Sequence, residues 1–427
     1  MENKFFKSTL ILMIGSLITR LLGFVIRIVF TRVIGSDGIN LYSMIMPTYS
    51  LLITIAQMGF PIAISNLIAK GEKSSKNIIF SIIPVSILIN IFVIACVFMF
   101  APFLSNVLLK NPNTYYPIIS IAFVIPFISL SSIVRGYFFG KQRMLPHTIS
   151  NIVEQVVRLI IILILLPKVI KYGEVLSVTY FVLFNIISEI ISILIFLLFL
   201  PKGFVVKRTD LKPDLGTAKD VLSISIPSTS SRIIGNIGFF FEPIILTNIL
   251  MFVGYSYSFV SGEYGIYNAY VIPVLTIPSF FITALSTAII PEVSKNQNNK
   301  VMIKRRLKQS LSISFVIGLF SSVVIMLFPN LILKTIYGTL DGVEYIKFLA
   351  PIFVLFYLEG PLISILQGLN EAKYSMKVTF WGIIIKLSSM SLISLFKVGI
   401  YGLIISEVIN ILFVLYFNFR KVMQKIK

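Results

Sequence analysis

Charged and redox-active side chains are scarce in this sequence. Only 13% of its 427 residues are charged, whereas soluble domains average about 25%. This deficit excludes a soluble globular protein. The lone Cys96 cannot form an intramolecular disulfide. The lone His147 has no set of Cys, His or carboxylate ligands around it, so we expect no metal site and no cofactor.

Apolar residues, in contrast, are abundant. They make up 57% of the chain, and the mean hydropathy is +0.95. Runs of about 20 apolar residues, long enough to cross a bilayer, recur along the whole length. The pattern predicts an all-α membrane protein with about 12 transmembrane helices. The first run is no cleavable signal peptide, because arginines interrupt it and no small-residue cleavage site follows. The expected spans are residues 9–33, 39–68, 78–104, 114–138, 147–167, 175–200, 220–250, 264–290, 309–333, 346–368, 375–396 and 400–419.

The chain is strongly basic, with a formal net charge of +20. When the loops are assigned to alternate sides of a membrane, 25 of the 37 Lys and Arg residues fall on the side of the N-terminus and 7 on the other side. Such a bias marks the cytoplasmic side, so we expect both termini in the cytoplasm and the protein in the cytoplasmic membrane. The basic surplus therefore indicates topology and contact with anionic membrane lipids, and not nucleic-acid binding.

Short motifs recur in the same order in the two halves of the chain. TRLLG at 19–23 is matched by SRIIG at 231–235, and GINLYSMIMP at 38–47 by GIYNAYVIP at 265–273. Such repeats predict two six-helix bundles related by a pseudo-two-fold axis along the membrane normal, as in transporters that alternate access around a central site. Two bundles suffice for one site, so we expect a monomer. The expected divisions are an N-terminal bundle at 1–200, a cytoplasmic linker at 201–219 and a C-terminal bundle at 220–427.

Three arginines lie where hydrocarbon should exclude them. A charge at the bilayer centre costs about 2.5–3.5 kcal/mol on insertion scales, so Arg20 should not face lipid. Arg27 follows seven residues later, about 20° around an ideal helix and about 10 Å along it, so the two share a face. Arg232 takes in the second half the place that Arg20 has in the first. We expect the three guanidinium groups to line a central cavity and to bind phosphate oxygens.

Pairing of each cation with a buried acid is the alternative. Glu154 and Arg158 are spaced i, i+4 on one expected helix, which favours a structural ion pair. Glu242 lies ten residues beyond Arg232, about 15 Å along a helix, which disfavours a direct pair between them. These residues are therefore candidates either for charge pairing or for coupling to a monovalent cation.

Breaks within the expected spans indicate candidate gate hinges. Gly59 and Pro61 lie in the second span, and Pro273 and Pro278 interrupt the eighth. Proline removes an intrahelical hydrogen bond and bends the helix, which a gate can use. A static kink is the alternative at each position, because proline is common in membrane helices.

Several segments resemble the stage V sporulation protein B family of polysaccharide-export proteins. The resemblance covers essentially the whole chain, and its most specific part is the segment at 131–158. The matching segments are SSIVRGYFFGKQRMLPHTISNIVEQVVR at 131–158, TRLLGFVIRIVFTRVIGSDGINLY at 19–42 and QMGFPIAIS at 57–65.

The resemblance implies a flippase superfamily that includes lipid II flippases, O-antigen translocases and multidrug exporters built from two six-helix bundles. It also implies that arginines of the first helix hold the diphosphate of a lipid-linked sugar. TRLLGF matches that stretch at Arg20. Arg27 lies one position away from the spacing that the second such arginine has in the lipid II flippases. The lipid II flippases and the sporulation proteins usually have two further C-terminal helices. This sequence stops near its twelfth span, as the O-antigen translocases do.

We therefore predict a flippase, and not an enzyme. It would move an anionic, polyprenyl diphosphate-linked oligosaccharide or peptidoglycan precursor from the inner to the outer leaflet by alternating access. A cation-coupled multidrug exporter of the same fold is the main alternative, with Glu242 as its acid. A polytopic glycosyltransferase fits less well, because the larger outer loops offer only Glu263, Asp341 and Glu344 as acids.

Overall fold

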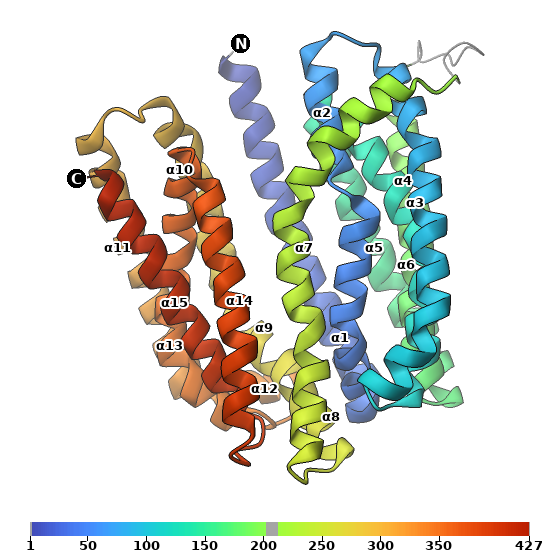
Figure 1. Cartoon of the computed structure of the whole chain (residues 1–427), viewed down its shortest axis with the longest axis vertical. Helices are drawn as coiled ribbons and strands as arrows, with labels where there is room; N and C mark the ends of the chain where they lie inside the picture. Colours follow the sequence, from blue (N-terminus) through green and yellow to red (C-terminus); the bar gives the residue numbers. More distant parts are fainter. Residues whose placement is uncertain (1, 202–211, 427) are drawn as a thin grey trace. The chain divides into compact units, whose positions relative to one another are not determined.

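The computed structural model describes residues 2–201 and 212–426 (Figure 1). Over these residues the chain forms helices joined by short turns, with no β-strand. The chain divides into two compact units, residues 1–240 and 241–427. The all-α architecture expected from hydropathy is confirmed. The bounds of the two bundles, 1–200 and 220–427, and the linker at 201–219 stay predictions, and residues 202–211 of that linker lie outside the described residues.

The N-terminal unit is built from long helices packed through apolar faces. Its core joins α2, α3, α4, α6 and the start of α7, with Phe60, Ile64, Ile78, Phe138 and Phe196 fully buried. The elements are α1 (Glu2–Gln57), α2 (Phe60–Lys70), α3 (Ser75–Phe103), the π-turn η1 (Leu104–Leu108), η2 (Pro112–Thr114), α4 (Tyr115–Gly140), α5 (Met144–Val169), η3 (Ile170–Tyr172), α6 (Glu174–Leu198) and α7 (Leu215–Phe252), whose last residues belong to the second unit.

Helix α1 contains a reversal of the chain. Gly35 has φ 77° and ψ 173°, outside the helical region, and glycine adopts a positive φ without the penalty of a Cβ atom. Residues twelve apart on a straight helix are separated by about 18 Å, yet the ring centroids of Phe30 and Tyr42 are 4.8 Å apart. The two limbs of α1, residues 2–34 and 36–57, are therefore two spans folded against each other.

The C-terminal unit has its own buried core, in which Val293, Leu362, Ile365, Leu366 and Val422 are fully buried. Its helices α10, α11, α13 and α15 pack against one another. The elements after α7 are α8 (Tyr257–Ile266), the π-turn η5 (Tyr267–Val271), α9 (Ile272–Thr276), α10 (Ser279–Lys295), α11 (Lys300–Leu327), α12 (Pro329–Tyr337), α13 (Val343–Gly368), α14 (Ala372–Ser394) and α15 (Tyr401–Ile426).

Twelve segments account for the twelve expected spans. Nine described helices are long and apolar enough to cross a membrane, and they correspond to the third to seventh and ninth to twelfth spans. The two limbs of α1, the second extended by α2, supply the first and second spans. The eighth span is not one helix but the broken series from α8 to α10. The physical reason is the pair of prolines, neither of which can donate the backbone hydrogen bond that an unbroken helix needs.

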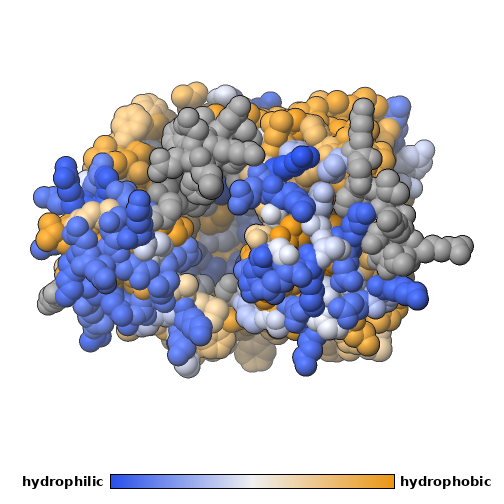
Figure 2. All heavy atoms as spheres, turned by 90° about the horizontal axis from the view of Figure 1, so that it is seen from above, coloured by the Kyte–Doolittle hydropathy of each residue, from blue (hydrophilic) through white to orange (hydrophobic). Residues whose placement is uncertain are grey.

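Hydrophilic side chains gather at one end of the helices in both units, as Figure 2 shows. In the N-terminal unit this is the end at which α2 ends and α4 is joined to α5, and in the C-terminal unit it is the end at which α10 is joined to α11 (Figure 1). Exposed cations of these segments include Lys70, Lys141, Arg143 and Lys300. They belong to the loops that the charge bias assigns to the cytoplasm.

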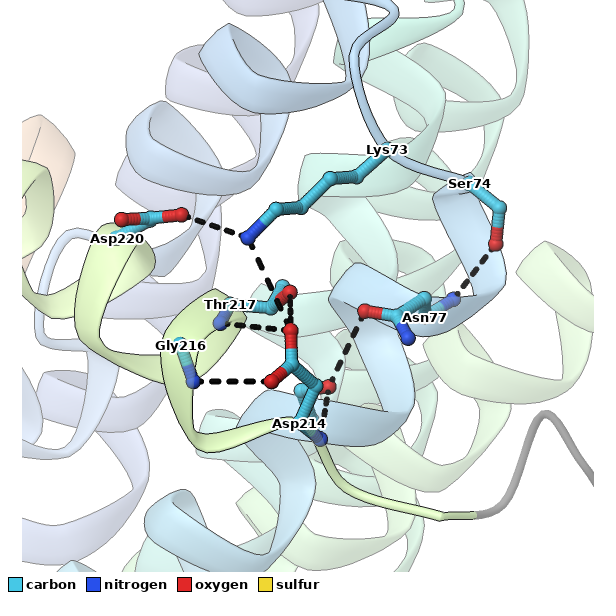
Figure 3. A network of polar contacts seen from close by, with 8 residues as sticks. Lys73, Ser74, Asn77, Asp214, Gly216, Thr217 and Asp220 are labelled. Atoms are coloured by element: carbon cyan, nitrogen blue, oxygen red, sulfur yellow. Dashed lines mark hydrogen bonds and ion pairs between the residues drawn. The ribbon is translucent and has the colours of Figure 1, made fainter.

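A polar network at this end fixes the start of α7 to the α2–α3 turn (Figure 3). Asp214 accepts hydrogen bonds from the backbone N–H groups of Gly216, at 3.0 Å, and Thr217, at 3.1 Å, which makes it the N-cap of α7. Its own backbone N–H donates to Ser81 of α3, at 2.9 Å. Lys73 Nζ lies 2.8 Å from a carboxylate oxygen of Asp220 and 3.8 Å from one of Asp214. Asp214 thereby attaches the start of α7 to α3, and Asp220 attaches it to the α2–α3 turn.

Replacing Asp214 by alanine should lower the free energy of unfolding, because it removes the side chain that caps the N-terminus of α7. Hydrogen bonds from the Thr217 hydroxyl and from the backbone of Gly216 and Thr217 hold the pKa of Asp214 below its ordinary value. The contribution is therefore full above the unfolded-state pKa of about 3.9 and is lost as the pH falls through the lower folded-state pKa. Unfolding in detergent at pH 7 and at pH 3 measures this difference.

The matched control is Asp220→Ala, which removes only a half-exposed ion pair with Lys73. Such surface pairs contribute about 0–1 kcal/mol. Equal effects of the two substitutions at pH 7, or an Asp214 effect that persists at pH 3, would show that capping is not the source of the stability.

Candidate functional site

A cavity of about 230 Å³ lies inside the N-terminal unit, enclosed by both limbs of α1 and by α5 and α6. Its wall combines apolar side chains with guanidinium, amide and phenol groups, which is the mixture expected of a small-molecule site. The lining residues are Gly23, Ile26, Arg27, Phe30, Tyr42, Met46, Tyr49, Gln155, Arg158, Phe181, Val182 and Asn185.

Arg27 is the sequence-predicted arginine that lines this cavity. It stands one helical turn after Gly23 and one before Phe30, so all three share a face of the first limb of α1. Its side chain is half-buried. The reversal at Gly35 brings the second limb, with Tyr42, to the same cavity. A guanidinium group therefore lies inside a unit whose helices are otherwise suited to lipid.

Aromatic rings from three helical segments form one side of the cavity. Phe30 lies between Tyr42, at a centroid distance of 4.8 Å, and Phe181 of α6, at 3.8 Å. Tyr42 and Phe181 meet edge to face at 5.2 Å. Such packing fixes the ring positions, because edge-to-face pairs add about 0.5–1.5 kcal/mol to the burial of their area.

Arg158 of α5 is the second guanidinium of the wall, and it is ion-paired. Its Nη2 donates to Glu154, at 2.8 Å, and to the hydroxyl of Ser188 on α6, at 3.3 Å. Nε also donates to Ser188, at 3.4 Å. The Glu154 side chain is 8% exposed and that of Arg158 21%. The i, i+4 pair considered from the sequence is therefore present, and it holds Arg158 in place at the cavity.

Arg20 and Arg232 do not line this cavity. Both side chains are exposed, and within residues 2–201 and 212–426 neither forms a salt bridge with a carboxylate. Arg20 lies on the first limb of α1, two turns before Arg27, and Arg232 lies in α7. The structure thus places Arg27 with Arg158, and leaves Arg20 and Arg232 on the surface of the N-terminal unit.

Glu242 forms part of a buried cluster in the C-terminal unit. The ammonium nitrogen of Lys386, on α14, lies 2.5 Å from a carboxylate oxygen of Glu242 and 2.5 Å from one of Glu407, on α15. The three side chains are 4–16% exposed. Sequence reasoning did not assign Lys386, although it lies well inside the expected span at 375–396. Its partner Glu242 is 144 residues away, so no spacing rule connects the two.

The candidate hinges lie at breaks of helices. Met58 and Gly59 have φ values of 40° and 62° between α1 and α2, and Pro61 stands in the first turn of α2. Pro273 begins α9 directly after the π-turn η5, and Pro278 precedes α10. These positions interrupt the backbone hydrogen-bond pattern, which is the property that a hinge requires.

The single histidine has an ordinary environment. The imidazole of His147 is half-buried, meets the ring of Phe139 edge to face at 4.7 Å, and lies 3.3 Å from the Asn151 amide. No group of three or more His, Cys, Asp or Glu side chains that could hold a metal ion is found among the described residues.

Comparison with protein families gives two matches. The family model described as "Polysaccharide biosynthesis protein" matches residues 5–297, and the model described as "MatE" matches residues 243–390. Together they cover most of both units.

Curated relatives also match over most of this chain. Stage V sporulation protein B of Bacillus subtilis (strain 168) is 34% identical over 408 residues, which is 90% of this chain and 77% of the relative. Lipid II flippase MurJ of the same organism is 25% identical over 434 residues, 91% of this chain and 77% of the relative.

Solved structures show the fold. An inward-facing multidrug resistance MATE family transporter of the MOP superfamily aligns with a TM-score of 0.72, at 16% identity, over 96% of this chain and 94% of that chain. An outward-facing structure of such a transporter aligns with a TM-score of 0.64, at 17% identity, over 98% and 95%.

Proposed function

Because the chain belongs to the polysaccharide biosynthesis protein family of multi-pass membrane transporters, we propose that it flips an anionic, lipid-linked glycan. The cargo is a polyprenyl diphosphate carrying an oligosaccharide or a peptidoglycan precursor, and it moves from the inner to the outer leaflet by alternating access. The observation that carries this proposal is the cavity with Arg27 and Arg158 inside an otherwise apolar unit. The similarity to a protein named as a lipid II flippase supports the same class of cargo.

In this proposal Arg20, Arg27 and Arg232 bind the diphosphate. Guanidinium groups pair with phosphate oxygens through two parallel hydrogen bonds. Arg20 and Arg232 are accessible and carry no carboxylate partner among the described side chains, so an anionic headgroup can approach them. The prenyl tail stays in lipid throughout.

The membrane context follows from the charge bias. Both termini lie in the cytoplasm, the protein resides in the cytoplasmic membrane, and one copy suffices for transport. An inside-negative potential then favours outward movement of an anion by about 2.3 kcal/mol per charge per 100 mV. The helix breaks at Gly59, Pro61, Pro273 and Pro278 serve as hinges between the inward- and outward-open states.

A cation-coupled multidrug exporter is less well supported. Such a pump needs an acid free to bind a proton, a monovalent cation or a cationic drug. Glu242, the acid proposed for that role, is in contact with the ammonium group of Lys386. This contact corresponds to the charge-pairing alternative for Glu242. An acid held in an ion pair is less available to bind a cation, which argues against the exporter.

Reconstituted vesicles test the proposal directly. A fluorescent polyprenyl diphosphate sugar is placed in both leaflets, and a membrane-impermeant reductant bleaches the outer leaflet over time. Wild-type protein should make the inner pool accessible. Arg20→Ala, Arg27→Ala and Arg232→Ala should each slow flipping about tenfold or more, since a hydrogen bond to a charged group contributes about 1.5–3 kcal/mol.

Arg32→Ala is the matched control, because Arg32 lies on the same limb of α1 but outside the cavity wall. It should flip at the wild-type rate. Unchanged rates in the Arg20 and Arg232 variants would refute the site assignment, and absence of flipping by the wild type would refute the function.

A further inference from the structure

Helix α11 of the C-terminal unit changes character along its length. Its first turns read KVMIKRRLKQS, residues 300–310, and lie at the hydrophilic end of the unit (Figure 1). From Leu311 onwards the helix continues as a run that is apolar enough to cross a membrane. The side chain of Asn299 caps the first turn by accepting a hydrogen bond from the Met302 N–H, at 3.0 Å. The basic residues therefore stand on a capped helix, where we expect the headgroup region of a bilayer.

Three cations on this part of α11 are open to an anion. The side chains of Lys304, Arg305 and Lys308 are exposed. Among the described side chains, no carboxylate lies within salt-bridge distance of any of the three. Arg306 differs from them, because its guanidinium group lies 2.6 Å from a carboxylate oxygen of Glu292 on α10. The acid next to α11 thus neutralises Arg306 and leaves the exposed face of the helix cationic.

The charge bias of the loops accounts for cations at this end of the helices, but not for their lack of a carboxylate partner. Elsewhere at the ends of helices such cations are paired. Lys425 of α15 lies 2.5 Å from a carboxylate oxygen of Glu371, and Lys73 of the α2–α3 turn lies 2.8 Å from one of Asp220. The exposed face of α11 instead gathers three cations within five residues, which favours an external anionic partner.

The same face of α11 becomes apolar further along the helix. Steps of three or four residues lead from Arg305 through Lys308, Ser312 and Val316 to Leu319, so these side chains share one face. Val316 is 63% exposed and Leu319 43%. Lys308 and Leu319 are about 16 Å apart along the helix, which is close to half of the roughly 30 Å hydrocarbon core. Cations, a hydroxyl group and an apolar stripe thus follow one another in the order of phosphate, glycerol and acyl chain in a phospholipid.

We propose that this face of α11 binds one anionic phospholipid of the surrounding bilayer, with the phosphate on Lys304, Arg305 and Lys308 and an acyl chain along Val316 and Leu319. Each Lys or Arg near an anionic membrane surface strengthens binding about fivefold. A zwitterionic phospholipid gains less, because its own cation offsets the attraction. The inference goes beyond the proposed function, since the bound lipid stays at the periphery of the C-terminal unit and is not the cargo.

Lipid binding to the purified full-length protein in mixed micelles tests the site. The probes are fluorescent phosphatidylglycerol and fluorescent phosphatidylcholine with identical acyl chains, and binding is followed by fluorescence anisotropy. Wild-type protein should bind phosphatidylglycerol at least about tenfold more tightly than phosphatidylcholine. The triple variant Lys304→Gln/Arg305→Gln/Lys308→Gln should reduce this preference to about twofold or less. Its thermal unfolding without added lipid should match that of the wild type, because the three side chains are exposed.

The matched control removes three other exposed cations of the same unit and should keep the preference for phosphatidylglycerol. It is the triple variant Lys373→Gln/Lys377→Gln/Arg420→Gln. Equal losses in the two triple variants would reduce the effect to general attraction by net charge and overturn the site. Equal binding of the two lipids by the wild type would overturn it as well.

The apolar part of the site is tested by Val316→Ala/Leu319→Ala. This double variant should weaken both lipids to the same extent, by about twofold or more, because it removes apolar area that an acyl chain covers. Unchanged binding would refute the acyl-chain contact. Displacement of phosphatidylglycerol from the wild type by an equimolar amount of farnesyl diphosphate would assign this face to the cargo and refute the phospholipid. No flipping is measured in these titrations, so their failure leaves the proposed function untouched.

Discussion

Lys386→Met should destabilise the protein by about 3–5 kcal/mol, because it removes the ammonium group that contacts the two buried carboxylates of Glu242 and Glu407. Both oxygens lie 2.5 Å from Lys386 Nζ, and the Glu242 side chain is 4% exposed. In a low-dielectric interior two adjacent carboxylates without a counter-charge repel each other and lose their solvation. Equilibrium unfolding in mixed micelles measures the loss.

Loss of the counter-charge can be distinguished experimentally from a general packing defect. The triple variant Glu242→Gln/Lys386→Met/Glu407→Gln removes all three charges and should recover most of the stability, since a buried ion pair is often replaceable by neutral groups of similar volume. Lys377→Met is the matched control, an exposed lysine on the same helix α14, with an expected change within about 0.5 kcal/mol. A loss below 1 kcal/mol for Lys386→Met would contradict the description of this cluster.

Gly59→Ala should lower stability by about 2–5 kcal/mol. The left-handed backbone at φ 62° costs a residue with a Cβ atom about 1–2 kcal/mol. An added Cβ would also lie 2.7 Å from Ser228 Oγ and 3.1 Å from Ser225 O on α7, and such overpacking costs about 1–3 kcal/mol. Thermal unfolding in detergent, with flipping measured on the surviving folded protein, gives both the stability and the hinge effect.

Gly71→Ala isolates the contribution of the contact with α7. Gly71 has φ 75°, at the end of the same helix α2, but an added Cβ meets nothing within 4 Å. It should cost about 1–2 kcal/mol from the backbone alone. Equal losses at the two glycines would show that close approach of α7 to Gly59 does not constrain this break.

Hydropathy predicted the number and order of the spans because each long apolar helix must satisfy its backbone hydrogen bonds internally in lipid. It did not predict the breaks inside the eighth span in detail. The prolines at 273 and 278 indicated an interruption, but the sequence pattern did not predict the π-turn η5 before them. The reversal within α1 was expected from the two spans, and Gly35 supplies its backbone conformation.

Candidate site residues were predictable only where the neighbouring residues on the same helix decide the prediction. Arg27 was identified because charge in a lipid-soluble run is costly, and Glu154 with Arg158 because they are one helical turn apart. The contact of Lys386 with Glu242 joins helices distant in sequence, so periodicity carries no information about it. The aromatic wall was missed for the same reason: Tyr42 and Phe181 are ordinary apolar-run residues until the helices that bear them meet.

The course of α7 has a mechanical consequence. The boundary between the compact units falls directly after Phe240, inside this uninterrupted helix, and Pro243 follows three positions later. Proline carries no amide hydrogen, so the carbonyl oxygen of Phe239 lacks the bond that would stiffen the rod at that point. Bending at this point therefore has to strain one backbone hydrogen bond fewer than elsewhere in the helix. Glu242, the residue directly before Pro243, is held by the ammonium group of Lys386 on α14, so the ion pair fixes this residue, just after the boundary, within the second unit.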